Sequence, residues 1–316
     1  MHRRHTKFTK RVNRAAAGIE SRGVRATYDI HDRFLSNRDA RKRFAAAPPV
    51  LDETQRKVLD ELRTEGFCVV KFTDLFTDTA VWDRLAAEGD RFVAETEAGL
   101  AREAAGENGN LRRSTKSFLV RRNAWGAELE PDDVWLQTAL DPRVLDIANT
   151  YLGLWSKLEY VDLWHTPATD APERVSSQRW HRDFNDRLLL KAFIYLNDVE
   201  EDAGPFEYVP RSFPGGEFDD FAPWWPGYHG YPSDEAFEKR MATAHVETFT
   251  APRGTLILCN TAGFHRGGYA TGNARTLATW TYCSPAALRA LSDRNYTLPR
   301  DAAVANGRAD AAFAVA

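Results

Sequence analysis

The stretch ARTLATWTYC at residues 274–283 decides the fold class, because its β-branched and aromatic residues are typical of a buried β-strand. The stretch GTLILCN at 254–260 has the same character. Both belong to a series of short strand-like runs that begins after residue 155, with turn residues between them. Eight such runs predict a β-sandwich or a jelly roll. They cover 157–166, 177–183, 189–197, 205–209, 246–250, 254–259, 264–270 and 275–283.

The part of the chain before residue 155 has a helical pattern instead. Apolar residues recur at helical spacing, and they predict helices over 52–66, 78–105 and 133–152, with one strand over 67–72. Helices that precede the strands argue against a doubly wound α/β sheet. We therefore expect a mainly β protein with flanking helices. Its expected divisions are a basic arm over 1–47, a single domain over 48–290 and a tail over 291–316.

Composition narrows the class of protein. The 316 residues are 43% hydrophobic and 28% charged, which is ordinary for a globular protein and excludes a disordered chain or a collagen-like fibre. No apolar run approaches the roughly 18 residues that a membrane span needs. The three cysteines are far apart, so we expect buried thiols in a reducing compartment. A cytoplasmic location follows as an expectation.

The net charge of −3 is unevenly distributed. Residues 1–47 hold 13 Lys/Arg and 4 Asp/Glu, a sum of +9, so the remaining residues sum to −12. A basic arm of this kind can be a targeting peptide, it can contact nucleic acid or a membrane surface, or it can fold onto the acidic body or onto a second subunit. We favour an arm that packs on the acidic body or on a second subunit. In the second case the protein would be a homo-oligomer. Nucleic acid is not expected, because the acidic body lacks interleaved basic and aromatic residues.

Three residues predict a metal site. His181 and Asp183 are two positions apart, so on a strand their side chains would point to the same face. His265 begins a later strand-like run. Two histidines and one carboxylate form a facial triad, which leaves metal positions open and is diagnostic of non-heme Fe(II) oxygenases.

Arg275 lies ten residues beyond His265 in an otherwise apolar strand. A buried guanidinium needs an anion, and its planar fork suits a carboxylate. The position therefore predicts a site for a dicarboxylate cosubstrate. The competing interpretation is a metal-binding jelly-roll protein without turnover, such as a sensor or scaffold, and Arg275 favours the enzyme.

The sequence resembles a known family at two places. The motif WHRD at 180–183 and the stretch LNDVEEDAGPFEYVPRS at 196–212 are similar to the phytanoyl-CoA dioxygenase family, and the resemblance covers roughly 55–285. These enzymes are Fe(II)- and 2-oxoglutarate-dependent oxygenases built on a double-stranded β-helix, the cupin-like jelly roll. Arg211 and Phe213 replace the glycine and histidine that are usual in the family. These departures concern the substrate rather than the chemistry.

The resemblance implies that His181, Asp183 and His265 hold Fe(II) and that Arg275 binds 2-oxoglutarate. The expected reaction uses O2 to hydroxylate a small-molecule substrate and releases succinate and CO2. The same triad also serves desaturation and epimerisation. Asp183 argues against halogenation, because related halogenases have a small residue at this position.

Other residues are candidates for contacts around the site. Gln178 either faces the cosubstrate or caps a strand. One of Lys116, Arg121 and Arg122 meets an anion, or all three lie on a solvated face. The long insertion over 213–245 is either an aromatic lid or a satellite hydrophobic cluster. The candidate substrate contacts are Lys116, Asn185, Arg187, Trp224 and Trp225.

Overall fold

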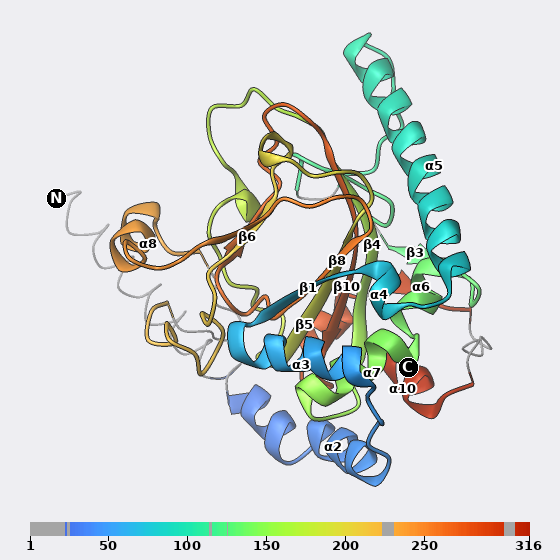
Figure 1. Ribbon diagram of the computed structural model, residues 1–316, viewed down its shortest axis with the longest axis vertical. Helices are drawn as coiled ribbons and strands as arrows, with labels where there is room; N and C mark the ends of the chain where they lie inside the picture. The colour runs from blue at the N-terminus through green and yellow to red at the C-terminus, as the bar shows by residue number, and fades with distance from the viewer. Residues whose placement is uncertain (1–22, 24–25, 114–115, 125, 223–230, 300–306) are drawn as a thin grey trace, which may run out of the picture.

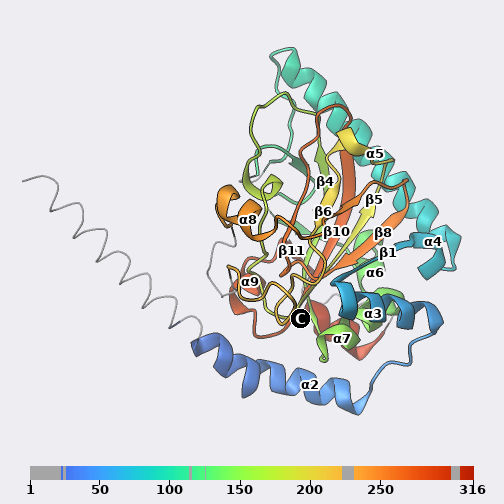
Figure 2. The same cartoon turned by 60° about the vertical axis from the view of Figure 1, so that its left-hand side comes forward.

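The computed structural model describes residues 23, 26–113, 116–124, 126–222, 231–299 and 307–316. A six-stranded antiparallel sheet, in the order β1-β8-β5-β10-β4-β2, lies against a three-stranded sheet in the order β7-β6-β9 (Figures 1 and 2). The expected jelly-roll architecture with flanking helices is confirmed. The strands are β1 (Phe67–Lys71), β2 (Val120–Arg121), β4 (Lys157–Thr166), β5 (Leu189–Tyr195), β6 (Phe206–Tyr208), β7 (Glu247–Phe249), β8 (Thr255–Cys259), β9 (His265–Arg266) and β10 (Arg275–Cys283), with β3 (Ala127–Glu128) and β11 (Tyr296–Thr297) paired separately.

Strand β10 lies inside the large sheet, where it pairs with both β4 and β5. All nine of its residues are buried, which agrees with their β-branched and aromatic character. Successive side chains alternate between the two faces. Leu277 packs between the sheets, whereas Ala278, Trp280 and Tyr282 pack toward the helices.

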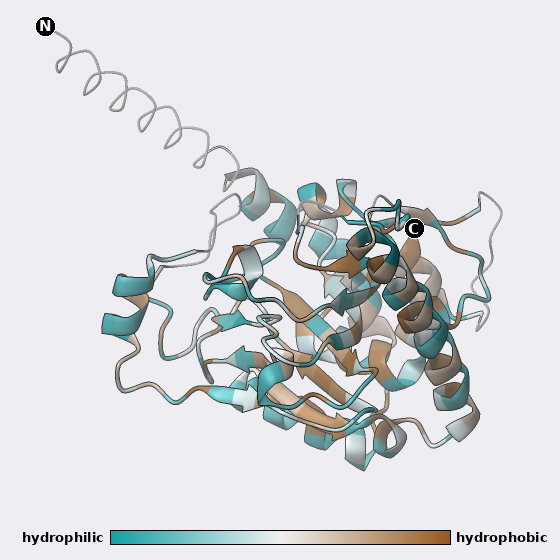
Figure 3. Cartoon of the chain, turned by 90° about the horizontal axis from the view of Figure 1, so that it is seen from above, coloured by the Kyte–Doolittle hydropathy of each residue, from teal (hydrophilic) through white to brown (hydrophobic). Residues whose placement is uncertain are grey.

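Helices cover the outer face of the large sheet. Two strand residues bind this layer through polar atoms, since Trp280 Nε1 donates to Trp135 O at 2.9 Å and Tyr282 Oη donates to Ala139 O at 2.7 Å. In Figure 3 the strands in the middle are largely hydrophobic, and the helices around them mix hydrophilic and hydrophobic residues. The helices are α2 (Ser36–Ala46), α3 (Glu53–Glu65), α4 (Phe72–Leu75), α5 (Thr79–Ala104), α6 (Val134–Ala139), α7 (Pro142–Leu152), α8 (Asp234–Arg240), α9 (Leu288–Ser292) and α10 (Ala309–Val315), with short 3-10 helices at Ser176–Gln178 and Glu201–Ala203.

Local sequence signals account for most of the element boundaries. Helix α3 begins at a capping box in which the Asp52 side chain and Gln55 bind each other's backbone N–H groups. It ends at Gly66, whose φ of 88° is a left-handed conformation that favours glycine. The single helix expected over 133–152 was wrong. The structure has α6 and α7 instead, because Asp141 caps a new helix that starts at Pro142.

Two of the expected strands also differ from the structure. Residues 177–183 form a 3-10 turn and a single bridge between His181 and His265 rather than a strand. The run over 264–270 is paired only at His265–Arg266, because Gly267 and Gly268 then turn the chain away.

Both ends of the described chain pack against the body. In the region expected to be a basic arm, Tyr28 donates a hydrogen bond to Asp186, Asn37 accepts one from Ala286 N at 2.9 Å, and Ala40 joins the core. In the expected tail, α10 places Ala311 and Ala314 in the same core. Among the described helices, none is long and apolar enough to cross a membrane.

Candidate active site

The WHRD segment is held in an extended conformation without being part of a regular strand. His181 and His265 exchange backbone hydrogen bonds of 3.0 and 2.9 Å, and Asp183 N donates to Thr261 O at 2.8 Å. Arg182 points away from the site and donates to the carbonyl oxygens of Ser212, Ala262 and Phe218. These bonds keep the alternating side-chain directions of a strand, so His181 and Asp183 point into the site and Arg182 points away from it.

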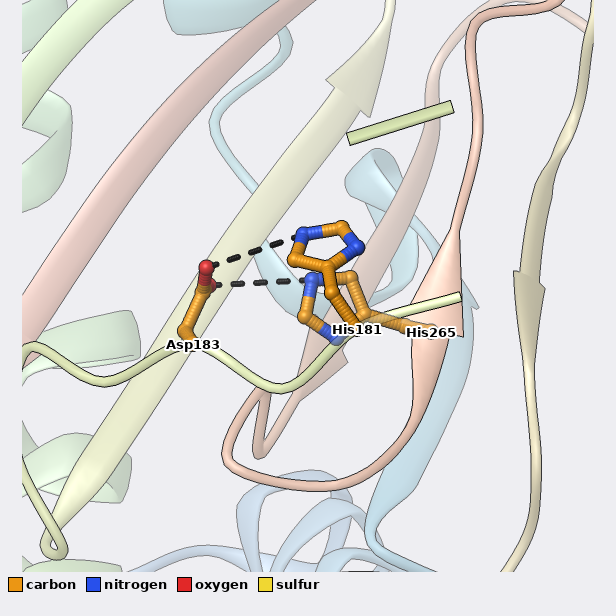
Figure 4. A group of neighbouring side chains, drawn as sticks. All are labelled: His181, Asp183 and His265. Carbon is orange, nitrogen blue, oxygen red and sulfur yellow. Dashed lines mark ion pairs between the residues drawn. The ribbon is translucent and has the colours of Figure 1, made fainter. Parts of the chain in front are cut away.

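The side chains of His181, Asp183 and His265 converge on one point (Figure 4). One ligand atom from each lies within 4.8 Å of the others. Nε2 of His181 is 3.8 Å from Asp183 Oδ1, and Nε2 of His265 is 3.7 Å from Asp183 Oδ2. These separations are too long for hydrogen bonds and suit atoms that share a metal ion.

Both histidines have the tautomer that a metal requires. Nδ1 of His181 lies 2.9 Å from Arg179 O, and Nδ1 of His265 lies 3.0 Å from Gly263 O. A carbonyl oxygen only accepts, so Nδ1 carries the proton and Nε2 keeps its lone pair. Burial lowers the pKa of His265 to about 4 and holds the pKa of His181 well below its ordinary value. Both rings are therefore neutral near pH 7.

Asp183 has a cationic partner in Lys191 of β5, whose Nζ lies 2.5 Å from Asp183 Oδ2. Burial would raise the pKa of the carboxyl group, but the charge of Lys191 and its hydrogen bond bring it below its ordinary value. Burial would likewise lower the pKa of Lys191, and the carboxylate raises it. The pair is therefore ionised, and the lysine fixes the orientation of the carboxylate.

We expect the change Lys191→Met to destabilise the metal-free protein by about 3–5 kcal/mol, because it leaves a buried carboxylate without its partner. Mn(II), a stand-in for Fe(II) that is stable in air, should reduce this loss by supplying a positive charge at Asp183. The measurement is the free energy of unfolding with and without Mn(II). Lys71→Met, at an exposed position of β1, is the control. An equal loss in the presence and absence of metal would contradict this role of Lys191.

Arg275 lies at the start of β10 and is 5% exposed. Its guanidinium interacts with the Tyr195 hydroxyl, whereas Nε and Nη1 have no hydrogen-bond partner among the described residues. Gly267 and Gly268 leave room for it, because a Cβ at either position would lie 3.0 Å from a guanidinium nitrogen. Unsatisfied buried donors of this kind indicate a missing anion.

Lys116 and Arg275 line the same cavity as the triad. Lys116 Nζ also lies 4.8 Å from the centre of the Trp164 ring. Burial, with the charge of Lys191, lowers the pKa of Lys116 to about 8. Two cationic side chains beside a metal-binding triad suit a small molecule with two carboxylates, one for the metal and one for Arg275.

The other candidates have different surroundings. The Gln178 amide is bonded on both sides, since Oε1 accepts from Val175 N at 2.9 Å and Nε2 donates to Gly268 O at 2.8 Å. It therefore anchors the loop that adjoins Arg275. Asn185 donates to Glu159 at 2.5 Å, and Arg187 is exposed. Two of the basic residues before the barrel form ion pairs away from the cavity, Arg121 with Asp162 and Arg122 with Asp133.

The insertion over 213–245 contributes both to a hydrophobic cluster and to the site. Phe218, Phe237 and Met241 pack with Trp180 and Phe264. Tyr231 stacks on the ring of His181, with centroids 5.0 Å apart and an interplanar angle of 9°. Trp224 and Trp225 lie outside the described residues.

Sequence reasoning missed Lys191, which is bonded to Asp183, and the buried Glu159, which is bonded to Asn185. Lys191 carried a usable signal, since it is a single charge within the apolar run LLLKAFIY at 188–195, as Arg275 is within its strand. Glu159 alternates with apolar residues near the start of β4, so its sequence context does not separate it from a solvent-exposed glutamate. Only its 5% exposure in the structure shows that it is buried.

The fold and the site together define a class of enzyme. A jelly roll that holds two histidines and an aspartate beside a buried arginine is a non-heme iron- and 2-oxoglutarate-dependent oxygenase. Residues 62–276 match the phytanoyl-CoA dioxygenase (PhyH) family, so the chain belongs to this family. Its cofactors are iron and 2-oxoglutarate, with O2 as the other cosubstrate.

Solved structures with a similar fold are distant in sequence. The 2-oxoglutarate-dependent epimerase SnoN from nogalamycin biosynthesis is 16% identical, with 73% of this chain and 83% of that chain covered and a TM-score of 0.48. EctD from S. alaskensis is 16% identical over 74% and 77%, with a TM-score of 0.49. HygX from Streptomyces hygroscopicus is 18% identical over 74% and 87%, with a TM-score of 0.44. No curated protein sequence matches the chain.

Proposed function

We propose that the enzyme hydroxylates a small molecule, with His181, Asp183 and His265 holding Fe(II). The proposal rests on the complete triad, because Asp183 occupies the position that a halogenating site leaves open. Bound iron, with 2-oxoglutarate and O2, supplies the oxidising chemistry, and the protein supplies orientation and a dry cavity. Membership of a family of enzymes also favours turnover over a non-catalytic metal-binding protein.

Each residue of the site then has a task that its contacts suit. The Nδ1 bonds of His181 and His265 to backbone carbonyls hold both rings with Nε2 toward the metal. Lys191 fixes one oxygen of Asp183. Arg275 offers its unpartnered nitrogens to the distal carboxylate of 2-oxoglutarate, and Lys116 supplies a second positive charge in the same cavity. Tyr231 covers His181 from the side of the insertion.

The reaction is tested by loading the protein with Fe(II) and 2-oxoglutarate without oxygen and then adding O2 with a panel of metabolites. We expect a metabolite to increase the release of succinate and to gain one oxygen atom, which labelled O2 would trace by mass spectrometry. A product that lost two hydrogens, or a stereoisomer with unchanged mass, would contradict hydroxylation and keep the enzyme class. No succinate with any metabolite would count against the proposed turnover.

The cytoplasmic location and the role of the basic arm over 1–47 stay predictions. The arm has a net charge of +9 and the rest of the chain has a net charge of −12. Opposite charges favour contact of the arm with the body or with a second copy of the chain. Size-exclusion chromatography with light scattering, run on the full chain, tests the second possibility.

A further inference from the structure

Arg182 is a buried cation that has no ion pair with a carboxylate among the described residues. It is 1% exposed, which is rare for an arginine without a charged partner. Burial lowers the pKa of its guanidinium to about 10, so the group is still charged near pH 7. It lies over the Phe264 ring, 3.9 Å from the ring centre, and it donates to the backbone carbonyls of Ser212, Phe218, Phe221 and Ala262. A buried charge is costly, so the contribution of Arg182 lies in what these bonds hold together.

One of these bonds holds the turn that orients two metal ligands. The first carbonyl of the turn over 261–263 accepts from Asp183 N at 2.8 Å, and the third lies 3.0 Å from Nδ1 of His265. The middle carbonyl, Ala262 O, accepts from Arg182 Nη1 at 2.8 Å. Consecutive peptide groups cannot move independently, because each peptide bond is planar. Arg182 therefore helps to fix the carbonyls that bind Asp183 and His265.

The other terminal nitrogen of Arg182 binds the insertion over 213–245. Nη2 donates to Phe218 O at 2.9 Å and to Phe221 O at 3.3 Å. A single planar group thus joins the turn beside the metal ligands to the first part of the insertion. A lysine could not make the same set of bonds, because it carries one nitrogen at the end of its chain.

The insertion also contacts the WHRD segment at two other points. On the face that points away from the site, the ring of Trp180 stacks on Phe237 of α8, with centroids 4.7 Å apart and an interplanar angle of 14°. On the face of the site, Tyr231 stacks on the metal ligand His181. The described part of the insertion therefore packs against both faces of the segment that supplies two of the three ligands.

We propose that Arg182 is a positioning residue that couples the insertion to the metal ligands, so that metal binding and the packing of the insertion stabilise each other. Such coupling is reciprocal, because it is one free energy shared by two sites. It would hold Tyr231 on His181 more firmly when the metal is bound. This inference rests on the proposed function, because it assigns an outer residue to the same metal site.

The first test uses the unmodified full chain. Hydrogen exchange followed by mass spectrometry compares peptides over 213–222 in the presence and absence of Mn(II). We expect Mn(II) to slow exchange there by at least about 5-fold, the lower end of typical coupling between sites. The amides of Glu217 and Phe221 can report this, since both donate to backbone carbonyls in the structure. Exchange over 309–316, in α10, should not change. The same exchange over 213–222 with and without bound Mn(II) would overturn the coupling.

The second test asks whether Arg182 is the residue that carries the coupling. Arg182→Lys keeps the charge without the planar fork, so it should remove the effect of Mn(II) on 213–222. It should also weaken Mn(II) binding by about 10- to 100-fold, the range for residues that orient metal ligands. Arg294→Lys is the matched control, because Arg294 also donates to backbone carbonyls, those of Ala314 and Val315, away from the site. It should leave both measurements unchanged.

The outcomes separate a positioning role from a purely structural one. If Arg182→Lys is less stable but keeps the Mn(II) affinity and the exchange effect of the wild type, Arg182 only supports the fold and the proposal is wrong. Should Arg182→Lys not fold, Arg182→Gln replaces it, because an amide donates to carbonyls without a buried charge.

Isothermal titration with Mn(II) separates this inference from the proposed function. If Mn(II) binds the wild type without slowing exchange over 213–222, the coupling fails and the triad is retained. If Mn(II) does not bind the wild type, the metal site itself is wrong, and both the proposed function and this inference fail with it.

Discussion

Replacing His265 with alanine is expected to abolish iron-dependent turnover, and His181→Ala should do the same. Each change removes a neutral Nε2 that a backbone carbonyl holds toward the site. Loss of an outer partner of a metal ligand costs about 10- to 100-fold in metal affinity or activity, so loss of the ligand itself should exceed that range. Anaerobic titration with Fe(II) and the rate of succinate release measure the two effects.

The fold should survive these changes, because the backbone hydrogen bonds that pair His181 with His265 do not depend on either side chain. Circular dichroism and the unfolding transition of the metal-free variants check this. His245→Ala is the control, since His245 is exposed and pairs with Glu247 outside the site. Wild-type iron affinity and turnover in either ligand variant would show that the triad is wrongly assigned.

Arg275→Ala is expected to lose most of the affinity for 2-oxoglutarate while it still binds Fe(II). The guanidinium has two buried nitrogens without partners among the described residues, and the metal ligands are not altered. One charge-assisted hydrogen bond contributes about 1.5–3 kcal/mol, which corresponds to roughly 10- to 150-fold in affinity. Arg275→Lys keeps the charge without the planar fork, so its loss should be intermediate.

Isothermal titration of 2-oxoglutarate into the anaerobic Fe(II) protein measures the affinities of the wild type, Arg275→Lys and Arg275→Ala. Arg253→Ala is the control, because Arg253 forms an ion pair with Asp90 away from the cavity. The same affinity in wild type and Arg275→Ala would remove Arg275 from the cosubstrate site. A parallel loss of Fe(II) binding would instead indicate that Arg275 supports the structure of the site.

Periodicity and residue type predicted most of the elements. The strand over 275–283 and the strand over 157–166 have the predicted bounds, because long β-branched and aromatic runs leave little choice of structure. The prediction of a single helix over 133–152 was wrong, because hydrophobic periodicity does not register the Asp141-Pro142 pair that starts a new helix. The WHRD segment failed as a strand because its pairing partner is a single residue, His265.

The sequence alone determined the chemistry of the site, because metal ligands and buried charges are recognisable by residue type and spacing. The two histidines, Asp183 and Arg275 were all identifiable in this way, since a charged residue in an apolar strand needs a partner. Lys191 meets the same criterion within its own strand.

Only the tertiary structure decided how these residues are surrounded. It placed Lys191 against Asp183, stacked Tyr231 on His181 and buried Oε2 of Glu159 without a hydrogen-bond partner in the described part of the chain. The residues of these contacts come from separate strands and loops. Their distances depend on how the two sheets and the helices pack, and no local pattern in the sequence encodes that packing.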